Sequence, residues 1–236
     1  MNDRAQAILD FWFDDLIVEK RFKKDEKFDQ LIREKFGEDH NKATSNEYDY
    51  WQDEPLTCLA LIILLDQFSR NLYRNDKKSF EYDFKARLIV NDAVYNGYLD
   101  QMDEYQRFFM LLPYIHSEEI IDHDRAYKLL TNYLSNHPNF SEIKKFWKDH
   151  TAVIKRFHRY PHRNKMLGRR STAEEIEFLD QPNSHGNYFV LPKRFTIKTP
   201  VIIKNKPIMV VKLGIWLNFK TPTTLVAIIH NPANDA

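Results

Sequence analysis

The segment 56–68, LTCLALIILLDQF, is apolar on almost every side when it is drawn as a helix. Such a helix is stable in water only when other elements surround it, so we expect it at the centre of the fold. At its carboxyl end, polar residues are spaced i, i+4: Asp66 with Arg70, and Gln67 with Asn71. This spacing places the two members of each pair on one face of a helix, where they can interact.

Most of the chain up to residue 180 also carries helical signals. Apolar residues recur at helical intervals in the segments 5–17, 27–37, 77–97, 103–138 and 140–157. Gly37 is expected to end the second of these helices, and Pro113 to kink or break a helix in 103–138. Residues 38–55 are polar and are predicted to be irregular. The chain has only five glycines, which favours helices over a sandwich or barrel, so we predict an all-α domain over residues 1–180.

Residues 181–236 differ in composition from the rest of the chain. They are rich in Val, Ile, Thr and Pro, and the KNKP piece at 204–207 is typical of a turn between apolar runs. They carry seven Lys/Arg and one acid, a net +6, and since the whole chain is +1, residues 1–180 carry −5. We therefore predict a separate C-terminal extension, a short β-rich tail of a few short strands or a hairpin.

Residues 155–170 contain seven Lys/Arg and no acid, in a segment that Pro161 and Gly168 prevent from forming one regular helix. Three uses of this charge fit: a nucleic-acid surface, a pocket for a small anion, or a structural arginine clamp. The acidic remainder of 1–180 opposes long-range attraction of nucleic acid, which we therefore disfavour as a partner. Arg outnumbers Lys by five to two, and the planar guanidinium suits two-point pairing with carboxylate or phosphate. The sequence does not decide between the other two interpretations, a structural clamp and a pocket for a small anion.

The HSEE motif at 116–119 is expected to span a junction between two helices. Ser117 is a candidate cap for the second helix, because its hydroxyl can accept from the first free amides. On one continuous helix, His116, Glu119 and His123 would share a face, as metal ligands do. That spacing is common and no cysteine or further histidine lies close to it, so we predict no metal.

The motifs of several enzyme classes are missing from the sequence. There is no G-x-S-x-G elbow, no G-x-x-x-x-G-K-[ST] loop and no G-x-G-x-x-G fingerprint, and we predict no cofactor.

The single cysteine, Cys58, lies in the apolar run and is expected to be a core thiol. One cysteine excludes an intramolecular disulfide and fits a cytoplasmic protein. The N-terminus lacks a secretory pattern, and no uncharged apolar run approaches the ~20 residues that span a bilayer.

Four segments together resemble the bacterial family called domain of unknown function 924: ILDFWF at 8–13, LALIILLDQFSRN at 59–71, HSEE at 116–119, and residues 150–179. The resemblance covers about residues 5–180. It implies a tetratricopeptide-like stack of antiparallel helix pairs, and no reaction. The family usually has Gly where this chain has His158.

In such a stack, the polar ends of several helices can meet on a concave face. We predict a site there that binds a small anionic molecule or an acidic peptide segment. The residues expected to line or brace it are Asp66, Arg70, Asn71, His116, Ser117, Glu118, His150, Arg159, His162, Arg163, Asn164 and Arg169. Two alternatives stay open: an enzyme with His150, His162 or Glu118 in acid–base roles, or motifs that are purely structural. The sequence specifies no oligomeric state.

Overall fold

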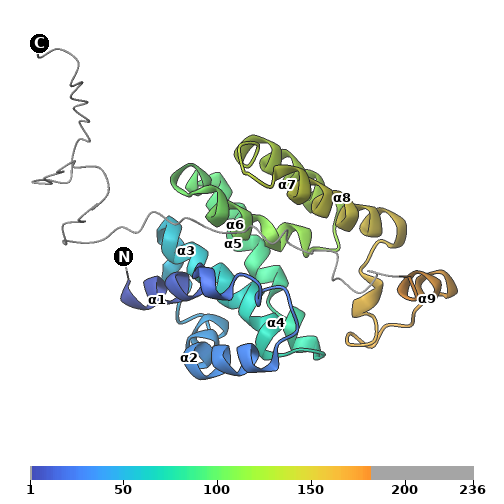
Figure 1. Ribbon diagram of the computed structural model, residues 1–236, viewed down its shortest axis with the longest axis horizontal. Coiled ribbons are helices and arrows are strands. Elements are labelled where there is room, and N and C mark those ends of the chain that lie inside the picture. The colour runs from blue at the N-terminus through green and yellow to red at the C-terminus, as the bar shows by residue number, and fades with distance from the viewer. Residues whose placement is uncertain (1, 182–236) are drawn as a thin grey trace, which may run out of the picture. The chain divides into compact units, whose positions relative to one another are not determined.

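The computed structural model describes residues 2–181, and over this range the chain is helical and contains no strand (Figure 1). Its α-helices are α1 (Asp3–Trp12), α2 (Glu26–Thr44), α3 (Pro55–Ile62), α4 (Ser69–Leu72), α5 (Asp83–Tyr95), α6 (Glu104–Ile115), α7 (Ile120–Tyr133), α8 (Phe140–Phe157) and α9 (Ala173–Leu179). Short 3₁₀ turns are formed by Asp15–Ile17, Asp49–Asp53, Lys77–Phe80, Tyr98–Gln101 and Pro161–Arg163. The all-α prediction is confirmed for these residues. The predicted β-rich tail lies outside the described part of the chain.

The apolar segment 56–68 is buried at the centre, as its composition predicts, and residues 59–65 are fully buried. The segment is not one regular α-helix. Between α3 and α4, Ile63–Phe68 form a π-helical turn, in which backbone hydrogen bonds span five residues instead of four. This wider turn changes the direction of the side chains that follow it, and turns of this kind are frequent at functional sites.

The π-helical turn explains why only one of the two predicted polar pairs forms. Asp66 and Arg70 do contact each other, with 3.1 Å between Oδ1 and the NH1 nitrogen. The predicted pair of Gln67 with Asn71 is wrong. Gln67 donates from Nε2 to Asp66, and Asn71 donates from Nδ2 to Asp29 on α2 at 2.8 Å.

Several helices surround the central segment. Helix α1 packs on α3, α2 packs on α4 and the π-helical turn, and α5 and α6 also contact α3. The aromatic ring of Phe68 lies edge-on to Trp12 at 5.5 Å between centroids, and Trp12 lies edge-on to Phe109 of α6 at 5.7 Å. Edge-to-face pairs of this kind add stabilisation beyond the area they bury. The central segment thus joins α1, α2 and α6 into one core.

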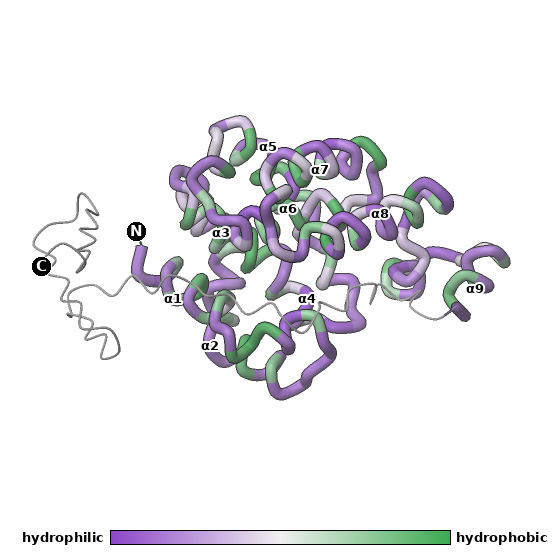
Figure 2. The backbone as a smooth tube through the Cα atoms, turned by 45° about the horizontal axis from the view of Figure 1, so that its top comes forward, coloured by the Kyte–Doolittle hydropathy of each residue, from purple (hydrophilic) through white to green (hydrophobic). Residues whose placement is uncertain are grey.

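Helices that follow one another in the chain pack together in the second half: α5 with α6, α6 with α7, and α7 with α8. Figure 1 shows α7 and α8 lying side by side. Hydrophobic and hydrophilic residues alternate along α8 (Figure 2), and its buried positions include Ile143, Trp147 and Ile154. The tetratricopeptide-like repeat pairing itself stays a prediction.

Two helix boundaries differ from the prediction. Helix α2 continues through Gly37 to Thr44, because Asp39, His40 and Ala43 are buried there and Asp39 accepts from Nε of Arg4 on α1 at 2.8 Å. Contacts of this kind outweigh the roughly 1 kcal/mol by which a helical glycine is less favourable than alanine. Helix α6 likewise continues past Pro113 and ends at Ile115.

Helix α8 ends at Phe157, as predicted, and His158 caps it in the left-handed region with φ 55°. This conformation is the usual one for a residue that closes a helix, and glycine adopts it without steric penalty. The glycine that the family usually has here is therefore explained by the backbone. His158 makes the same turn with a side chain in place.

Candidate functional site

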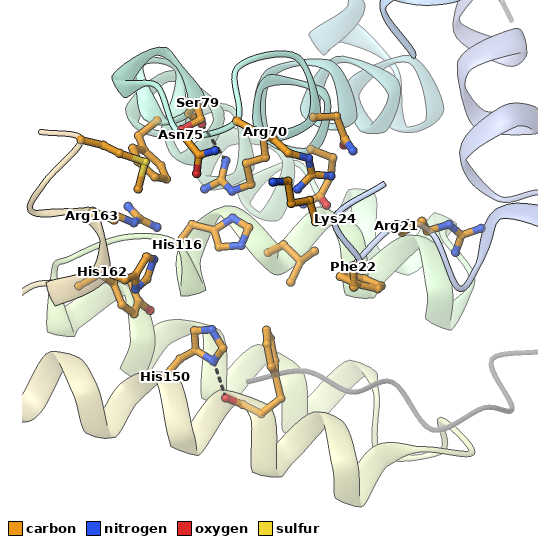
Figure 3. Close-up of a pocket in the computed structure, with 18 residues that line it drawn as sticks. Arg21, Phe22, Lys24, Arg70, Asn75, Ser79, His116, His150, His162 and Arg163 are labelled. Atoms are coloured by element: carbon orange, nitrogen blue, oxygen red, sulfur yellow. Dashed lines mark hydrogen bonds between the residues drawn. The ribbon is translucent and has the colours of Figure 1, made fainter. Parts of the chain in front are cut away.

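A cavity of about 460 Å³ lies among the loop that leads into α2, the end of the central segment, α6, α8 and the basic stretch (Figure 3). Its described lining contains no Asp or Glu. The cationic and histidine side chains that line it are Arg21, Lys24, Arg70, Arg74, Arg163, His116, His150 and His162. Segments far apart in the sequence therefore contribute positive charge to one hollow. Figure 3 shows the Arg21 side chain pointing away from the other labelled residues, so it adds little to the charge that faces the cavity.

Asp66 and His116 form a buried pair at one wall of this cavity. His116 closes α6, and its Nδ1 lies 2.7 Å from Oδ1 of Asp66, a residue with no exposed surface. Burial favours a higher pKa for Asp66, but Arg70 and His116 outweigh it and lower the pKa to about 2. Asp66 is therefore a carboxylate and can only accept, so Nδ1 of His116 carries the proton.

The pKa of His116 is lowered, first by burial and then by the nearby Arg70, although Asp66 opposes both effects. The ring is therefore neutral at physiological pH. Since Nδ1 holds the single proton, Nε2 carries a lone pair. Within the described residues no hydrogen-bond partner reaches Nε2, and the His116 side chain is 16% exposed. A hydrogen-bond acceptor thus faces the cavity.

Asp83, at the start of α5, connects Arg70 to Arg163. Arg70 donates to both carboxylate oxygens of Asp83, at 2.9 and 3.0 Å, and Arg163 reaches the same carboxylate at 3.3 Å. Asp66 and Asp83 do not line the cavity, whereas Arg70 and Arg163 do. The carboxylates therefore lie behind the arginines, and the guanidiniums form the surface that a ligand would meet.

Arg163 is the most constrained of these cations. Its guanidinium lies between the rings of Phe80 and Tyr160, 4.6 Å from each ring centroid, and the residue is only 6% exposed. Burial lowers the pKa of Arg163, partly offset by Asp83. Apart from the 3.3 Å contact with Asp83, its donors are poorly used: Nε has no hydrogen-bond partner in the described structure.

The two histidines proposed as acid–base residues, His150 and His162, both line the cavity. His150 donates from Nδ1 to the carbonyl oxygen of Phe146 at 2.9 Å, and burial lowers its pKa to about 3. A ring with so low a pKa is a weak base near neutral pH. Figure 3 shows His150 and His162 across the cavity from Arg70.

Glu118, the third acid–base candidate, is held by the basic stretch and does not line the cavity. It accepts from Arg169 at 2.6 and 2.9 Å and from the backbone N–H of Tyr160 at 2.8 Å. The pKa of Glu118 is lowered, because Arg169 and the Tyr160 amide outweigh the effect of burial. This is a two-point arginine–carboxylate clamp of the kind that the composition of 155–170 allows.

A second clamp lies beside it. Arg159 donates to both oxygens of Glu175 at 2.6 and 2.8 Å, and Asn164 donates to the same carboxylate at 3.2 Å. Glu175 also forms a capping box with Thr172 at the start of α9, as the spacing of a Thr followed three residues later by a Glu favours. Half of the predicted site residues do not line the cavity, because their polar groups contact one another or other parts of the fold. These residues are Asp66, Ser117, Glu118, Arg159, Asn164 and Arg169.

The HSEE junction differs from the prediction in one respect. Glu119, and not Ser117, is the N-cap of α7; the Ser117 hydroxyl accepts from the Glu119 amide at 3.1 Å and donates to Asp122 at 2.6 Å. His116 belongs to the end of α6, so it shares no helix face with Glu119 and His123. Among residues 2–181, no group of three metal-ligating side chains occurs.

Several residues at the cavity were missed by the sequence analysis. Asp83 is one acid among many on an amphipathic helix, Phe80 is an ordinary aromatic residue, and Lys24 lies in a charged loop. Arg74 pairs with Asp29, the same carboxylate that accepts from Asn71. No local signal distinguishes these residues from other polar and aromatic ones, because their roles arise only from long-range contacts.

Over residues 2–181, the fold and the cavity define a helical domain with a hollow lined by arginine and histidine side chains. No helix within 2–181 combines the length and the apolar character that a membrane crossing requires. The chain belongs to the family described as bacterial protein of unknown function (DUF924), which it matches over residues 8–183. Among solved structures, it is similar to a protein of unknown function from Agrobacterium tumefaciens. The two are 34% identical with a TM-score of 0.69, and the match covers 75% of this chain and 97% of that one. No curated protein matches the sequence.

Proposed function

We propose that this protein binds a small anionic molecule in the cavity between Arg163, Arg70 and Lys24. The observation that carries the proposal is the state of Arg163, which is nine-tenths buried, has one carboxylate contact at 3.3 Å and leaves Nε without a partner among the described residues. A buried charge is unfavourable unless it is paired and hydrogen-bonded. An oxyanion in the cavity would supply the missing acceptor.

The arrangement of charge around the cavity supports an anion over a cation or a neutral ligand. Asp83 is shared between Arg70 and Arg163, so two guanidiniums divide one carboxylate at this point. Lys24 adds an ammonium group that forms no ion pair within residues 2–181, and Figure 3 shows it on the side of the cavity away from Arg163. Guanidinium groups bind carboxylate and phosphate oxygens in a planar, two-point geometry.

The size of the cavity favours a small molecule over the acidic peptide segment. Its volume of about 460 Å³ falls in the range of ~300–1,000 Å³ that is typical of small-molecule sites. Phe22, Phe80, Leu112 and Met166 supply apolar lining beside the charged groups. Such a combination holds the carbon skeleton of a ligand while a few polar groups fix its orientation.

Calorimetric titration with inorganic phosphate, sugar phosphates and short carboxylic acids tests the proposal. We expect heat of binding from at least one class of anion, and at least about a tenfold loss of affinity in Arg163→Met, because a charged hydrogen bond is worth roughly 1.5–3 kcal/mol. Arg156→Met is the matched control, since Arg156 lies in the same basic stretch but pairs with Glu174 at the surface. Equal binding by wild type and Arg163→Met, or binding of none of these anions, would refute the proposal.

The Asp66–His116 pair favours acid–base catalysis as a second candidate function. A buried carboxylate that fixes the tautomer of a histidine, with the other ring nitrogen open to a cavity, is the arrangement of many general bases. The nearby guanidiniums are placed to stabilise negative charge that develops on a substrate. A pH-dependent turnover that His116→Gln removes while anion binding is retained would support this candidate.

For the two clamps around Glu118 and Glu175 we propose a purely structural role. Their carboxylates already accept several hydrogen bonds each, so they have little capacity left for a ligand. They fasten the irregular segment after α8, and thereby hold Arg163 in position.

We also propose that the helices pair as in tetratricopeptide repeats and that the protein is cytoplasmic.

A further inference from the structure

We infer that the ligand of this cavity is an anion that also carries a hydroxyl group, and that Nε2 of His116 accepts the hydrogen bond of that hydroxyl. The inference rests on the proposed function and deepens it. The ligand class comprises hydroxy acids, sugar phosphates and monohydrogen phosphate. Anions that can only accept hydrogen bonds, such as sulfate, are excluded from it.

The first step concerns the tautomer of His116. Its Nδ1 lies 2.7 Å from Oδ1 of Asp66, which also forms an ion pair with Arg70 at 3.1 Å. A carboxylate held among two such donors has no proton to give, so the proton lies on Nδ1. The tautomer is therefore fixed by the fold, and Nε2 is an acceptor.

The second step concerns what else faces the cavity. The cationic side chains that line the cavity together with His116 can only donate: they include the guanidiniums of Arg70, Arg74 and Arg163 and the ammonium group of Lys24. The Ser79 hydroxyl donates to the carbonyl oxygen of Asp76 at 2.6 Å. An anion that satisfies the cationic donors presents acceptor atoms, and one of these against Nε2 would place two lone pairs together. A ligand that also has a hydroxyl satisfies both kinds of group at once.

The third step concerns selectivity. A site built to hydrogen-bond a substrate hydroxyl rejects the analogue that lacks it far more strongly than an apolar pocket rejects a missing methylene, because the buried polar group is left unpaired. His116 meets this condition, since its side chain is only 16% exposed and it lines the cavity. The fold thus places a selective acceptor beside less selective cationic donors.

Two pairs of probes of equal charge test the inference. Monohydrogen phosphate and sulfate are both divalent tetrahedral anions, but only the first has a hydroxyl. Glycolate and acetate are both monovalent, and again only the first has one. By calorimetric titration at pH 7.5, we expect the hydroxylated member of at least one pair to bind at least about tenfold more tightly than its partner.

His116→Gln should reduce this preference to less than about threefold, because a side-chain amide can rotate to present either a donor or an acceptor. His123→Gln is the matched control and should keep the preference, since His123 does not line this cavity. Long-range ¹H–¹⁵N spectra of the wild-type imidazoles give a readout that needs no variant, and they should show the Nδ1–H tautomer for His116.

The outcomes separate the inference from the proposed function. If both members of each pair bind equally, or the sulfate complex is the tighter one, the inference is wrong and the anion site stands. If none of the four anions binds, the inference is wrong; if the sugar phosphates also give no heat of binding, the proposed function is wrong as well. An Nε2–H tautomer of His116 also overturns the inference, whatever the affinities.

Discussion

Replacing Asp66 by alanine should destabilise the protein strongly, because it removes the centre of a buried network. Asp66 has no exposed surface; its carboxylate accepts from His116 at 2.7 Å and from Gln67 at 2.5 Å, and forms an ion pair with Arg70 at 3.1 Å. Removing one partner of a buried ion pair costs roughly 3–5 kcal/mol, since the other charge is left uncompensated. Arg70 keeps its two-point contact with Asp83. We therefore expect a loss at the lower end of that range, about 3 kcal/mol.

The pKa of Asp66 gives a second figure of the same order. A carboxyl whose pKa falls from its ordinary value near 3.9 to about 2 on folding contributes on the order of 2–3 kcal/mol to stability at neutral pH. For a domain of this size, a loss of about 3 kcal/mol lowers Tm by roughly 6–12 °C. Circular dichroism and the fluorescence of the buried Trp12, Trp51 and Trp147 can both follow the melt.

Asp149→Ala is the matched control. Asp149 also pairs with a cation four residues away, Lys145, at 2.5 Å, but both side chains are more than a third exposed. Exposed pairs with this spacing contribute only about 0.3–0.5 kcal/mol, so the control should melt within about 2 °C of wild type. If Asp66→Ala melts no lower than Asp149→Ala, then the buried network does not stabilise the fold and the reasoning fails.

Two further predictions concern single positions. His158→Gly should raise the free energy of unfolding by about 0.5–1 kcal/mol, because glycine adopts the left-handed conformation of His158 (φ 55°) without steric penalty; urea denaturation measures this, and a destabilised variant would contradict it. Asn46→Gly, at φ 71°, should change stability less, since asparagine tolerates this region. Because folding lowers the pKa of Asp66, its contribution is complete above about pH 4 and is lost as the pH falls toward 2. Acid denaturation should therefore be less steep in Asp66→Ala than in wild type, and identical profiles would argue against the shift.

Features of the fold that depend on nearby residues could be predicted from the sequence. The central position of 56–68 follows from the absence of a polar face, and the capping box of Thr172 and Glu175 depends on residues three apart. The end of α8 at Phe157 is equally local. The π-helical turn could not be predicted, because the sequence alone does not favour it over a regular helix. The continuation of α2 past Gly37 depends on a contact with Arg4, 35 residues from Asp39.

In the candidate site too, the features that depend on nearby residues could be predicted from the sequence, and those that depend on distant residues could not. The motifs that carry Arg and His were identifiable, and the basic stretch contains both the clamp and the cavity residue Arg163. Which arginine serves which purpose depends on partners distant in the chain: Arg163 meets Asp83 across 80 positions, and Arg169 meets Glu118 across 51. His116 and Asp66 are 50 positions apart. Composition and spacing hold no information on pairs at such separations, so the sequence suggested His150, His162 and Glu118 for acid–base roles and His116 only as a residue that lines or braces the site.

The buried carboxylates connect the stability of this protein to its proposed ligand chemistry. Asp66 and Asp83 neutralise the arginines from behind, which makes it possible to bury guanidinium groups beside an apolar core. The same contacts leave the cavity side of Arg163 and the Nε2 of His116 without partners in the described structure. A network built only for stability would be expected to satisfy the buried Nε of Arg163 as well, because an unsatisfied buried donor costs about 1–3 kcal/mol. The two clamps at Glu118 and Glu175 do satisfy their members, so the fold is able to do so where no ligand is required.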